Sequence, residues 1–286
     1  MKPAPFPEAA VDDPALRTLY LSLLKRTLTR AISTENVIRY SFHERSLKGM
    51  LFEPLRRLLA LGGMELVKIE PLDMARREEG RDWPFDAETM IGLKRLDNVE
   101  RCVRYVLEHD VPGDLIEAGV WRGGTTIFMR AILKAWGDIR RRVWVADSFA
   151  GLPAPDGKRY PADRGDVHWA YRQLAVSLDQ VRDNFDRYGL LDDQVRFLKG
   201  WFKDTLPAAP IDKLAVMRLD GDMYESTMDA LTALYPRLSP GGFVIIDDYG
   251  AVPACKSAVN DFRIQRGLAE PLEVIDWAGV YWQRRT

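Results

Sequence analysis

The sequence predicts an α/β fold, in which a mostly parallel sheet carries helices on both faces and follows a helical extension. From residue 114 onward, short apolar runs alternate with amphipathic segments. Such alternation is typical of parallel strands joined by crossover helices. Near the end of the chain two β-rich runs leave no room for a helix between them, so they should be antiparallel neighbours. The 286 residues are 47% hydrophobic, which suits one large domain with a smaller attached unit.

The helical extension is expected to occupy residues 1–83. Residues 15–32 predict an amphipathic helix, because apolar side chains recur there at helical spacing. These side chains are Leu16, Tyr20, Leu23 and Leu24. A second helical stretch is expected near residues 47–61, interrupted by Pro54. The apolar faces of both must pack against the main domain or against a second copy of the chain.

The main domain is expected to occupy residues 84–286 and to begin with a helix over residues 87–109. Strands are predicted over residues 114–120, 142–149, 194–200, 214–220 and 242–248. Helices are predicted between them over residues 125–136, 174–189 and 227–238. The two β-rich runs at the end lie on either side of Ala278 and Gly279.

The composition argues against several kinds of partner. Forty-one basic and 42 acidic residues leave a net charge of −1, and no basic block is present to neutralise phosphates, so nucleic acid is not expected. The start lacks the apolar stretch of a secretory signal, and no segment is long and apolar enough for a membrane span, which predicts a cytoplasmic protein. Cys102 and Cys255 are far apart and are expected to be buried, reduced thiols.

A glycine-rich turn joins the first predicted strand of the alternating region to its helix. Gly119, Gly123 and Gly124 allow the backbone to approach a ligand where a helix offers free N–H groups. The spacing differs from G-x-G-x-x-G, and Glu117 would repel a diphosphate but attract an ammonium group.

Asp147 ends the next strand, where a carboxylate can accept hydrogen bonds from both hydroxyls of a ribose. The plain alternative is that the glycines form tight turns and Asp147 caps a helix. Taken together, the two features favour an adenosine ligand with a cationic, amine-bearing tail, which describes S-adenosylmethionine better than NAD.

Four carboxylates follow two later strands, at the sheet edge where open α/β folds bind ligands. They are Asp220, Asp222, Asp247 and Asp248. Two carboxylates about 4 Å apart repel by roughly 4 kcal/mol at an effective dielectric constant of about 20, and a divalent cation would remove that cost. Because all the ligands are oxygens, Mg²⁺, Mn²⁺ or Ca²⁺ is favoured over zinc. Alternatively, the acids cap the following helix or are solvated.

Several motifs resemble the macrocin O-methyltransferase family, the Mg²⁺-dependent enzymes that methylate sugars of macrolide and aminocoumarin antibiotics. The motifs are ETMIGLKRLDN, DLIEAGVWRGG, VWVADSFAGLP, GWFKDTLP, RLDGDMY and LSPGGFVIIDDYG. The resemblance covers residues 81–285 and the first helix. It implies the Rossmann-like class I S-adenosylmethionine-dependent methyltransferase fold, with a mostly parallel seven-stranded sheet whose last strand is antiparallel. It also implies a homodimer or higher assembly in which the N-terminal helices help to close the site.

By matching motifs, the resemblance also implies a set of site residues. The donor would be held by Glu117, Gly119, Val120, Trp121, Thr125, Asp147, Ser148, Gly200, Trp201 and Phe202. Mg²⁺ would be held by Asp220, Asp247 and Asp248, with Asp222 as general base. The acceptor would be a sugar hydroxyl of a glycosylated natural product. The alternatives are a catechol or other vicinal diol, an NAD-dependent oxidoreductase, and a binding module without chemistry.

The insertion PAPDGKRYPADRGDVHWAY after the Asp147 strand is longer than connections usually are and is a plausible lid over the acceptor. Its side chains Tyr160, His168, Trp169 and Tyr171 could line a pocket, although exposed positions are the default. The three histidines, His43, His109 and His168, stand isolated in the sequence and are expected at the surface or at helix ends.

Overall fold

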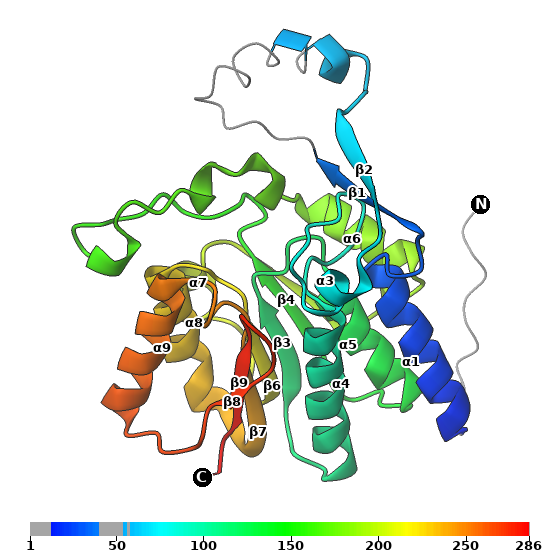
Figure 1. The fold of residues 1–286 in the computed structure, drawn as a ribbon. Coiled ribbons are helices and arrows are strands. Elements are labelled where there is room, and N and C mark those ends of the chain that lie inside the picture. The colour runs from blue at the N-terminus through cyan, green and yellow to red at the C-terminus, as the bar shows by residue number, and fades with distance from the viewer. Residues whose placement is uncertain (1–12, 40–53, 56–57, 286) are drawn as a thin grey trace.

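A central sheet of seven strands organises the computed structural model, which describes residues 13–39, 54–55 and 58–285 (Figure 1). The strands are β3 (Asp114–Ala118), β4 (Val143–Asp147), β5 (Val195–Lys199), β6 (Leu214–Leu219), β7 (Leu238–Ile246), β8 (Glu273–Val274) and β9 (Val280–Gln283). Their order is β5-β4-β3-β6-β7-β9-β8. The first five positions are parallel, whereas β9 runs antiparallel to both β7 and β8. The predicted fold class and the antiparallel pair at the end are thus confirmed.

Helices cover both faces of this sheet (Figure 1). On one face lie α4 (Leu93–Glu108), α5 (Gly124–Ala135) and α6 (Leu178–Arg187), and on the other α7 (Phe202–Thr205), α8 (Tyr224–Leu234) and α9 (Pro253–Arg266). Because both faces are covered, a strand such as β6 is buried at every position.

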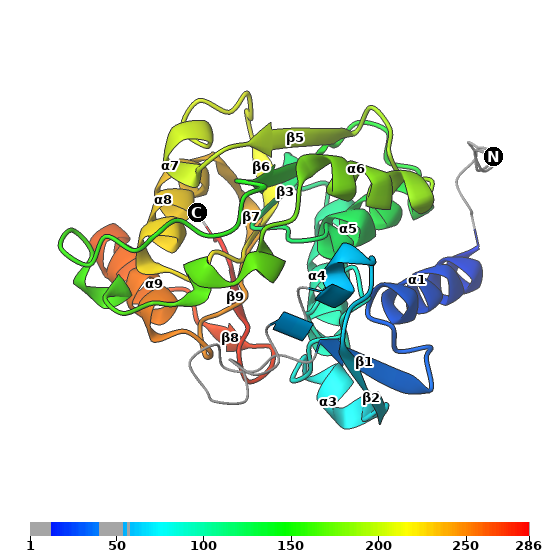
Figure 2. The same cartoon turned by 90° about the horizontal axis from the view of Figure 1, so that it is seen from above.

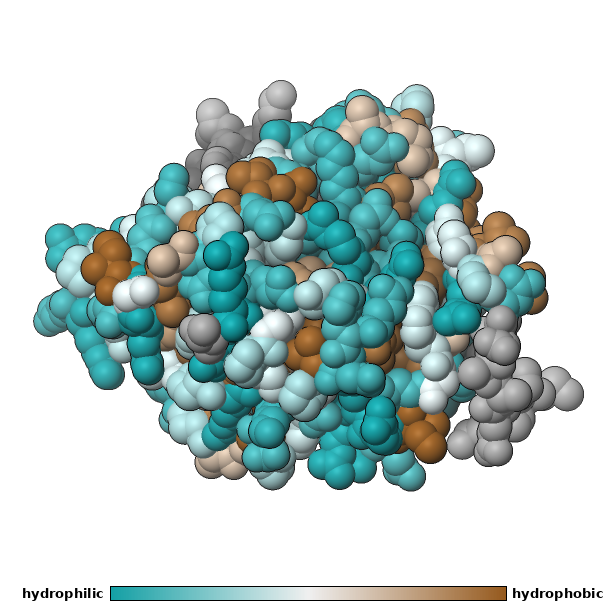
Figure 3. Space-filling model, turned by 90° about the horizontal axis from the view of Figure 1, so that it is seen from below, coloured by the Kyte–Doolittle hydropathy of each residue, from teal (hydrophilic) through white to brown (hydrophobic). Residues whose placement is uncertain are grey.

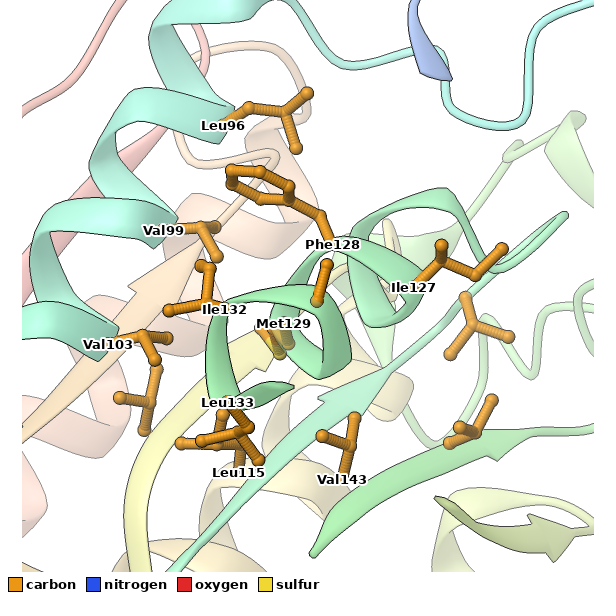
Figure 4. Packing of buried hydrophobic residues seen from close by; sticks show 14 of the residues in the cluster. Leu96, Val99, Val103, Leu115, Ile127, Phe128, Met129, Ile132, Leu133 and Val143 are labelled. Carbon is orange, nitrogen blue, oxygen red and sulfur yellow. The ribbon is translucent and has the colours of Figure 1, made fainter. Parts of the chain in front are cut away.

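The core under α4 and α5 is built from aliphatic and aromatic side chains. Figure 4 shows Leu96 and Val99 of α4 packed against Phe128 and Ile132 of α5, with Leu115 of β3 below. All five side chains are fully buried. This packing fixes α4 against the sheet, and α4 carries one residue of the site described below.

The helices differ from the sequence prediction in two main respects. The helix expected over residues 87–109 begins only at Leu93, with Gly92 as its N-cap. Helix α9, Pro253–Arg266, was not predicted at all, although Pro stands at its first position and Gly267 ends it in a left-handed conformation. It is the crossover that allows the chain to return to the sheet edge as β8 and β9.

The N-terminal region is not wholly helical, which corrects the prediction. Helices α1 (Pro14–Leu28) and α3 (Met74–Glu78) flank an antiparallel pair of strands, β1 (Glu35–Arg39) and β2 (Val67–Pro71). The strands are five residues each and lie far apart in sequence, so their alternation was too short to signal a sheet. The second predicted helical stretch is helical at residues 54–55 and 58–61, and the rest of it lies outside the described residues.

Helix α1 has two apolar faces. It packs on α4 and α5 through Leu21, Leu24 and Leu28, which are buried. On the other face Leu16 and Leu23 are 53% and 60% exposed. Of the predicted apolar set only Leu24 is buried, so a second copy of the chain remains the predicted partner for the rest.

Two further predictions concern the state of the cysteines and the presence of membrane-spanning helices. Cys102 and Cys255 are buried and free, as predicted. None of the helices in the described ranges combines the length and apolarity needed to cross a bilayer. On the face shown in Figure 3, hydrophobic residues are scattered among hydrophilic ones.

Candidate active site

A cavity of about 830 Å³ opens at the carboxyl edge of the parallel strands. Its walls come from the turns after β3, β4, β5, β6 and β7, from the insertion between β4 and α6, and from segments around residues 80–83 and 277–278. Ligands of open α/β folds bind at this edge. Both parts of the site predicted from the sequence therefore face one space.

The turn after β3 is held by neighbouring strands. The N–H of Gly119 donates to the carbonyl of Ala146 at 2.8 Å, and φ at Gly119 is +91°. A Cβ atom at this position would lie 1.8 Å from the carbonyl oxygen of Asp220. Glycine is therefore required here, and Gly119 faces the cavity.

Asp147 stands at the end of β4 and lines the same cavity. Its carboxylate accepts the backbone N–H groups of Val120 at 2.8 Å and Phe149 at 2.7 Å. Burial raises the pKa of Asp147, and these N–H groups oppose the rise. Asp147 thus accepts N–H groups of the turns after β3 and β4, not of a helix, while it faces the ligand space.

The predicted donor residues fall into two groups. Those that line the cavity are Gly119, Trp121, Asp147, Ser148, Gly200, Trp201 and Phe202. Glu117, Val120 and Thr125 are buried and lie behind the wall. Val120 turns its backbone N–H toward Asp147, and the side chain of Thr125 is near enough to Glu117 to lower the pKa of that carboxyl.

Glu117 pairs with an arginine of the neighbouring strand. Strands β3 and β6 pair so that Glu117 stands beside Arg218, whose guanidinium donates to its carboxylate. Burial raises the pKa of Glu117 to about 8, with Arg218 acting in the opposite direction. The expected contact of Glu117 with an ammonium group of the donor stays a prediction.

Three of the predicted acids converge where β6 and β7 end. One carboxylate oxygen from each of Asp220, Asp247 and Asp248 lies within 4.8 Å of the others. The parallel register places Leu219 beside Ile246, and the N–H of Asp247 donates to the carbonyl of Leu219 at 2.9 Å. These acids are therefore set by the ends of two paired strands.

Asp222 stands beside this cluster in a left-handed conformation, with φ +54°. Its N–H donates to Oδ2 of Asp248 at 3.2 Å. Aspartate tolerates this conformation better than most residues with a Cβ. The backbone hydrogen bond holds the Asp222 turn against the three-acid cluster.

Two arginines partly neutralise the acids, for which only a metal ion was predicted. Arg218 pairs with Asp247 and lies 3.0 Å from Oδ2 of Asp220. Arg95 of α4 pairs with Asp247 and donates to Asp276 at 2.9 Å. Arg95 was missed because 152 positions separate it from Asp247, and only the packing of α4 brings them together.

Protonation divides the acids into two kinds. Burial opposes ionisation of Asp247, but Arg218 and Arg95 outweigh it and lower its pKa. Burial and neighbouring acids raise the pKa of Asp220 to about 6, that of Asp222 to about 7, and that of Asp248 as well. No ion pair of the described residues involves Asp222 or Asp248. The cluster is thus acidic, made of oxygen donors and not fully compensated, which fits a hard divalent cation.

The insertion between β4 and α6 forms one wall of the cavity. Figure 2 shows it passing over the side of α8 and α9. His168 and Tyr171 line the cavity, whereas Tyr160 does not and Trp169 is half exposed. His109 ends α4, as predicted for a helix-end role, and His43 lies outside the described residues.

Other cavity residues come from segments that carried no recognised signal. Trp83 and Arg81 belong to the N-terminal region, and Trp277 to the loop before β9. The indole N–H of Trp277 donates to the carbonyl of Glu79 at 2.7 Å. The guanidinium of Arg81 lies 4.7 Å from the centre of the Trp277 ring. The tryptophans were the available clue, because large aromatic residues in loops often line ligand sites.

Comparisons with known proteins agree with this geometry. Residues 17–284 match the family described as Macrocin-O-methyltransferase (TylF). A Streptomyces olivaceus protein named 8-demethyl-8-(2,3-dimethoxy-alpha-L-rhamnosyl)-tetracenomycin-C 4'-O-methyltransferase is 54% identical over 268 residues, 93% of either chain. Demethyldecarbamoylnovobiocin O-methyltransferase of Streptomyces niveus is 59% identical over 210 residues, which are 73% of this chain and 80% of that protein. The structure of the O-methyltransferase NovP has a TM-score of 0.81 and 47% identity, covering 94% of this chain and 100% of its own.

Proposed function

Because the chain belongs to the macrocin O-methyltransferase family, and is thus an S-adenosylmethionine-dependent O-methyltransferase, we propose that its acceptor is a sugar hydroxyl of a glycosylated natural product. The resemblance seen in the motifs is confirmed by this membership. One relative is named for a 4'-O-methylation on a rhamnosylated tetracenomycin. The observation that carries the proposal is the single cavity shared by the glycine turn, Asp147 and the acid cluster.

The residues proposed to hold the donor are those of the predicted set that line the cavity. Asp147 would accept hydrogen bonds from the ribose hydroxyls, and Trp201 and Phe202 would flank the adenine. S-adenosylmethionine supplies a methyl group on a positively charged sulfur. Glu117, Val120 and Thr125 would act by holding the turn rather than by touching the donor.

Asp220, Asp247 and Asp248 are proposed to hold Mg²⁺, which would lower the pKa of a bound hydroxyl and orient it. Support comes from the convergence of their oxygens and from the absence of an ion pair at Asp248 within the described ranges. Arg95 and Arg218 hold the carboxylate of Asp247 in position from two sides. The carboxylate of Asp247 is therefore preorganised even before a cation binds.

Asp222 is proposed as the general base. As the oxygen–methyl bond forms and the sulfur–methyl bond breaks, its carboxylate would take the proton of the acceptor hydroxyl. Burial and the neighbouring Asp220 raise the pKa of Asp222 to about 7, which makes it a stronger base than an exposed aspartate. It lines the cavity next to the acid cluster, where the reacting hydroxyl would lie.

Assays with two acceptor substrates distinguish the proposed sugar acceptor from its main alternative, a catechol. The purified protein is incubated with S-adenosylmethionine, Mg²⁺ and either p-nitrophenyl α-L-rhamnopyranoside or catechol, and methylated products are identified by mass spectrometry. Methylation of the rhamnoside, at a rate well above that of catechol, is expected. Turnover of catechol alone would assign the enzyme to catechol-type acceptors, and methylation of neither would contradict the proposed acceptor class.

A further inference from the structure

The insertion between β4 and α6 is fixed to the domain on both sides of the cavity. Asp163 accepts the N–H groups of Tyr224 at 2.6 Å and Glu225 at 3.0 Å, and so caps the first turn of α8. The indole N–H of Trp121 donates to the carbonyl of Gln173 at 2.8 Å. Residues between these two anchors are thus held at a defined place beside the site.

Asp166 and His168 lie between the anchors and form a paired unit. One oxygen of Asp166 accepts the backbone N–H of His168 at 2.8 Å, and the other lies 2.8 Å from Nδ1 of the ring. The side chain of Asp166 is only 10% exposed, against 37% for His168. An ionised carboxylate can only accept, so Nδ1 donates to Asp166, and when the ring is neutral Nε2 is left as a hydrogen-bond acceptor.

The ring of His168 faces the ligand space. Both Asp166 and His168 line the cavity together with Tyr171, whose ring meets the imidazole edge-on with centroids 5.6 Å apart. Asp222 lines the same cavity. A hydrogen-bond acceptor of fixed orientation and an aromatic ring therefore face the same cavity as the proposed base, an arrangement suited to one edge and one face of a sugar.

We propose that His168, oriented by Asp166, binds the acceptor by accepting a hydrogen bond from one of its hydroxyls at Nε2. The inference rests on the proposed function and names a specificity residue for it. His168 fixes which hydroxyl of the sugar reaches Asp222, and Tyr171 packs beside the bound ring. Asp166 does not touch the acceptor and is a positioning residue.

Two substitutions of His168 that are similar in size distinguish a role of Nε2 from a role of Nδ1. In His168→Gln the terminal amide reaches roughly the place of Nε2, whereas in His168→Asn it reaches only that of Nδ1. With p-nitrophenyl α-L-rhamnopyranoside, the Asn variant is expected to raise the acceptor KM by about tenfold, which matches the loss of one hydrogen bond. The Gln variant is expected to stay within about threefold of the wild type. Asp166→Asn should give an intermediate rise.

The controls distinguish an effect on acceptor binding from effects on folding and on donor binding. Calorimetry with S-adenosylhomocysteine should give the same Kd for every variant, and His109→Gln, at the end of α4 away from the cavity, should keep the wild-type KM. An unchanged acceptor KM in His168→Asn, or equal losses in the Asn and Gln variants, would overturn the inference while leaving the proposed function intact. If the wild type methylates no glycoside, both fail.

Discussion

Gly119 and Asp220 are in such close backbone contact that a Cβ atom on Gly119 would lie 1.8 Å from the carbonyl oxygen of Asp220. The N–H of Asp220 in turn donates to the carbonyl of Ala118 at 2.9 Å. The glycine turn and the acid turn are thus one rigid unit at the end of β3 and β6. Any displacement of the turn that faces the donor must also move the first acid of the cluster.

Gly119→Ala should therefore destabilise the fold by at least about 3 kcal/mol and abolish binding of both donor and metal. The control is Gly267→Ala at the end of α9, where φ is also positive, +62°, but nothing lies within 4 Å of the added atom. This control should cost only about 1–2 kcal/mol. Urea unfolding measures both, and equal losses would show that the contact with Asp220 is not what requires glycine.

Asp222→Asn tests the general base. Asparagine tolerates the left-handed backbone, so the turn should be kept while the proton acceptor is lost. The expected result is a fall in kcat of at least about 100-fold with an unchanged Kd for S-adenosylhomocysteine. A kcat near that of the wild type in rapid-quench assays would move the role of base to another group.

Removal of metal should abolish methyl transfer. Protein stripped with EDTA should be inactive and recover fully with Mg²⁺. In Asp248→Asn the Mg²⁺ concentration needed for half-maximal rate should rise by at least about 10- to 100-fold. Substitution of a residue that only hydrogen-bonds to a metal ligand already lowers metal affinity by that factor. Full activity of the stripped protein, with residual metal excluded by elemental analysis, would contradict the role of the acid cluster.

Arg218 should be essential for stability. It is fully buried among Glu117, Asp220 and Asp247, so Arg218→Met leaves Glu117 and Asp220 without their ion-pair partner and Asp247 with Arg95 alone. The free energy of unfolding is expected to fall by on the order of 3–5 kcal/mol. Arg104→Met, which breaks an exposed pair with Glu108, should cost less than about 1 kcal/mol. Similar losses in the two variants would show that Arg218 is not compensating buried charge.

Mg²⁺ affinity should rise with pH. Burial and neighbouring acids raise the pKa of Asp220 to about 6 and raise that of Asp248 well above its usual value, so protons compete with the metal for these ligands at low pH. Calorimetry in two buffers of different ionisation enthalpy should detect proton release near pH 6 that fades by about pH 8. An affinity that does not change over this range would argue against protonated carboxyls at the site.

The raised pKa values of Asp220 and Asp222 also determine how the stability of the metal-free protein changes with pH. From about pH 4 to about pH 7 the folded acids retain protons that the unfolded chain has already released. The contribution of these groups to the free energy of unfolding must therefore fall as the pH rises through that window. Saturating Mg²⁺ should reduce the fall, which thermal unfolding at several pH values can follow.

Much of the fold could be predicted from local pattern alone. The parallel strands are nearly continuous apolar runs because helices cover both faces, and the acids at their ends stand out for the same reason. Helix α9 and the pair β1 and β2 were missed. The buried stripe of α9 is made largely of small side chains, Ala254, Cys255 and Ala258, which give a weak apolar signal. The two strands are short and separated by a long stretch of chain.

Site residues could be predicted where they directly follow the ends of strands. They could be predicted less well where packing brings distant parts of the chain together. Asp220 and Asp247 follow adjacent strands, so their approach follows from topology. Arg95 reaches Asp247 only because α4 packs over the sheet. The pairing of Asp166 with His168 is local in sequence, but its position in the cavity depends on how the insertion folds back.

The most direct measurement of the central claim is the anomalous scattering of Mn²⁺, used in place of Mg²⁺, in crystals of the protein with S-adenosylhomocysteine. The account predicts one strong peak at about 2.1 Å from an oxygen of each of Asp220, Asp247 and Asp248. A map without such a peak, in which these carboxylates contact only Arg95, Arg218 and water, would contradict it.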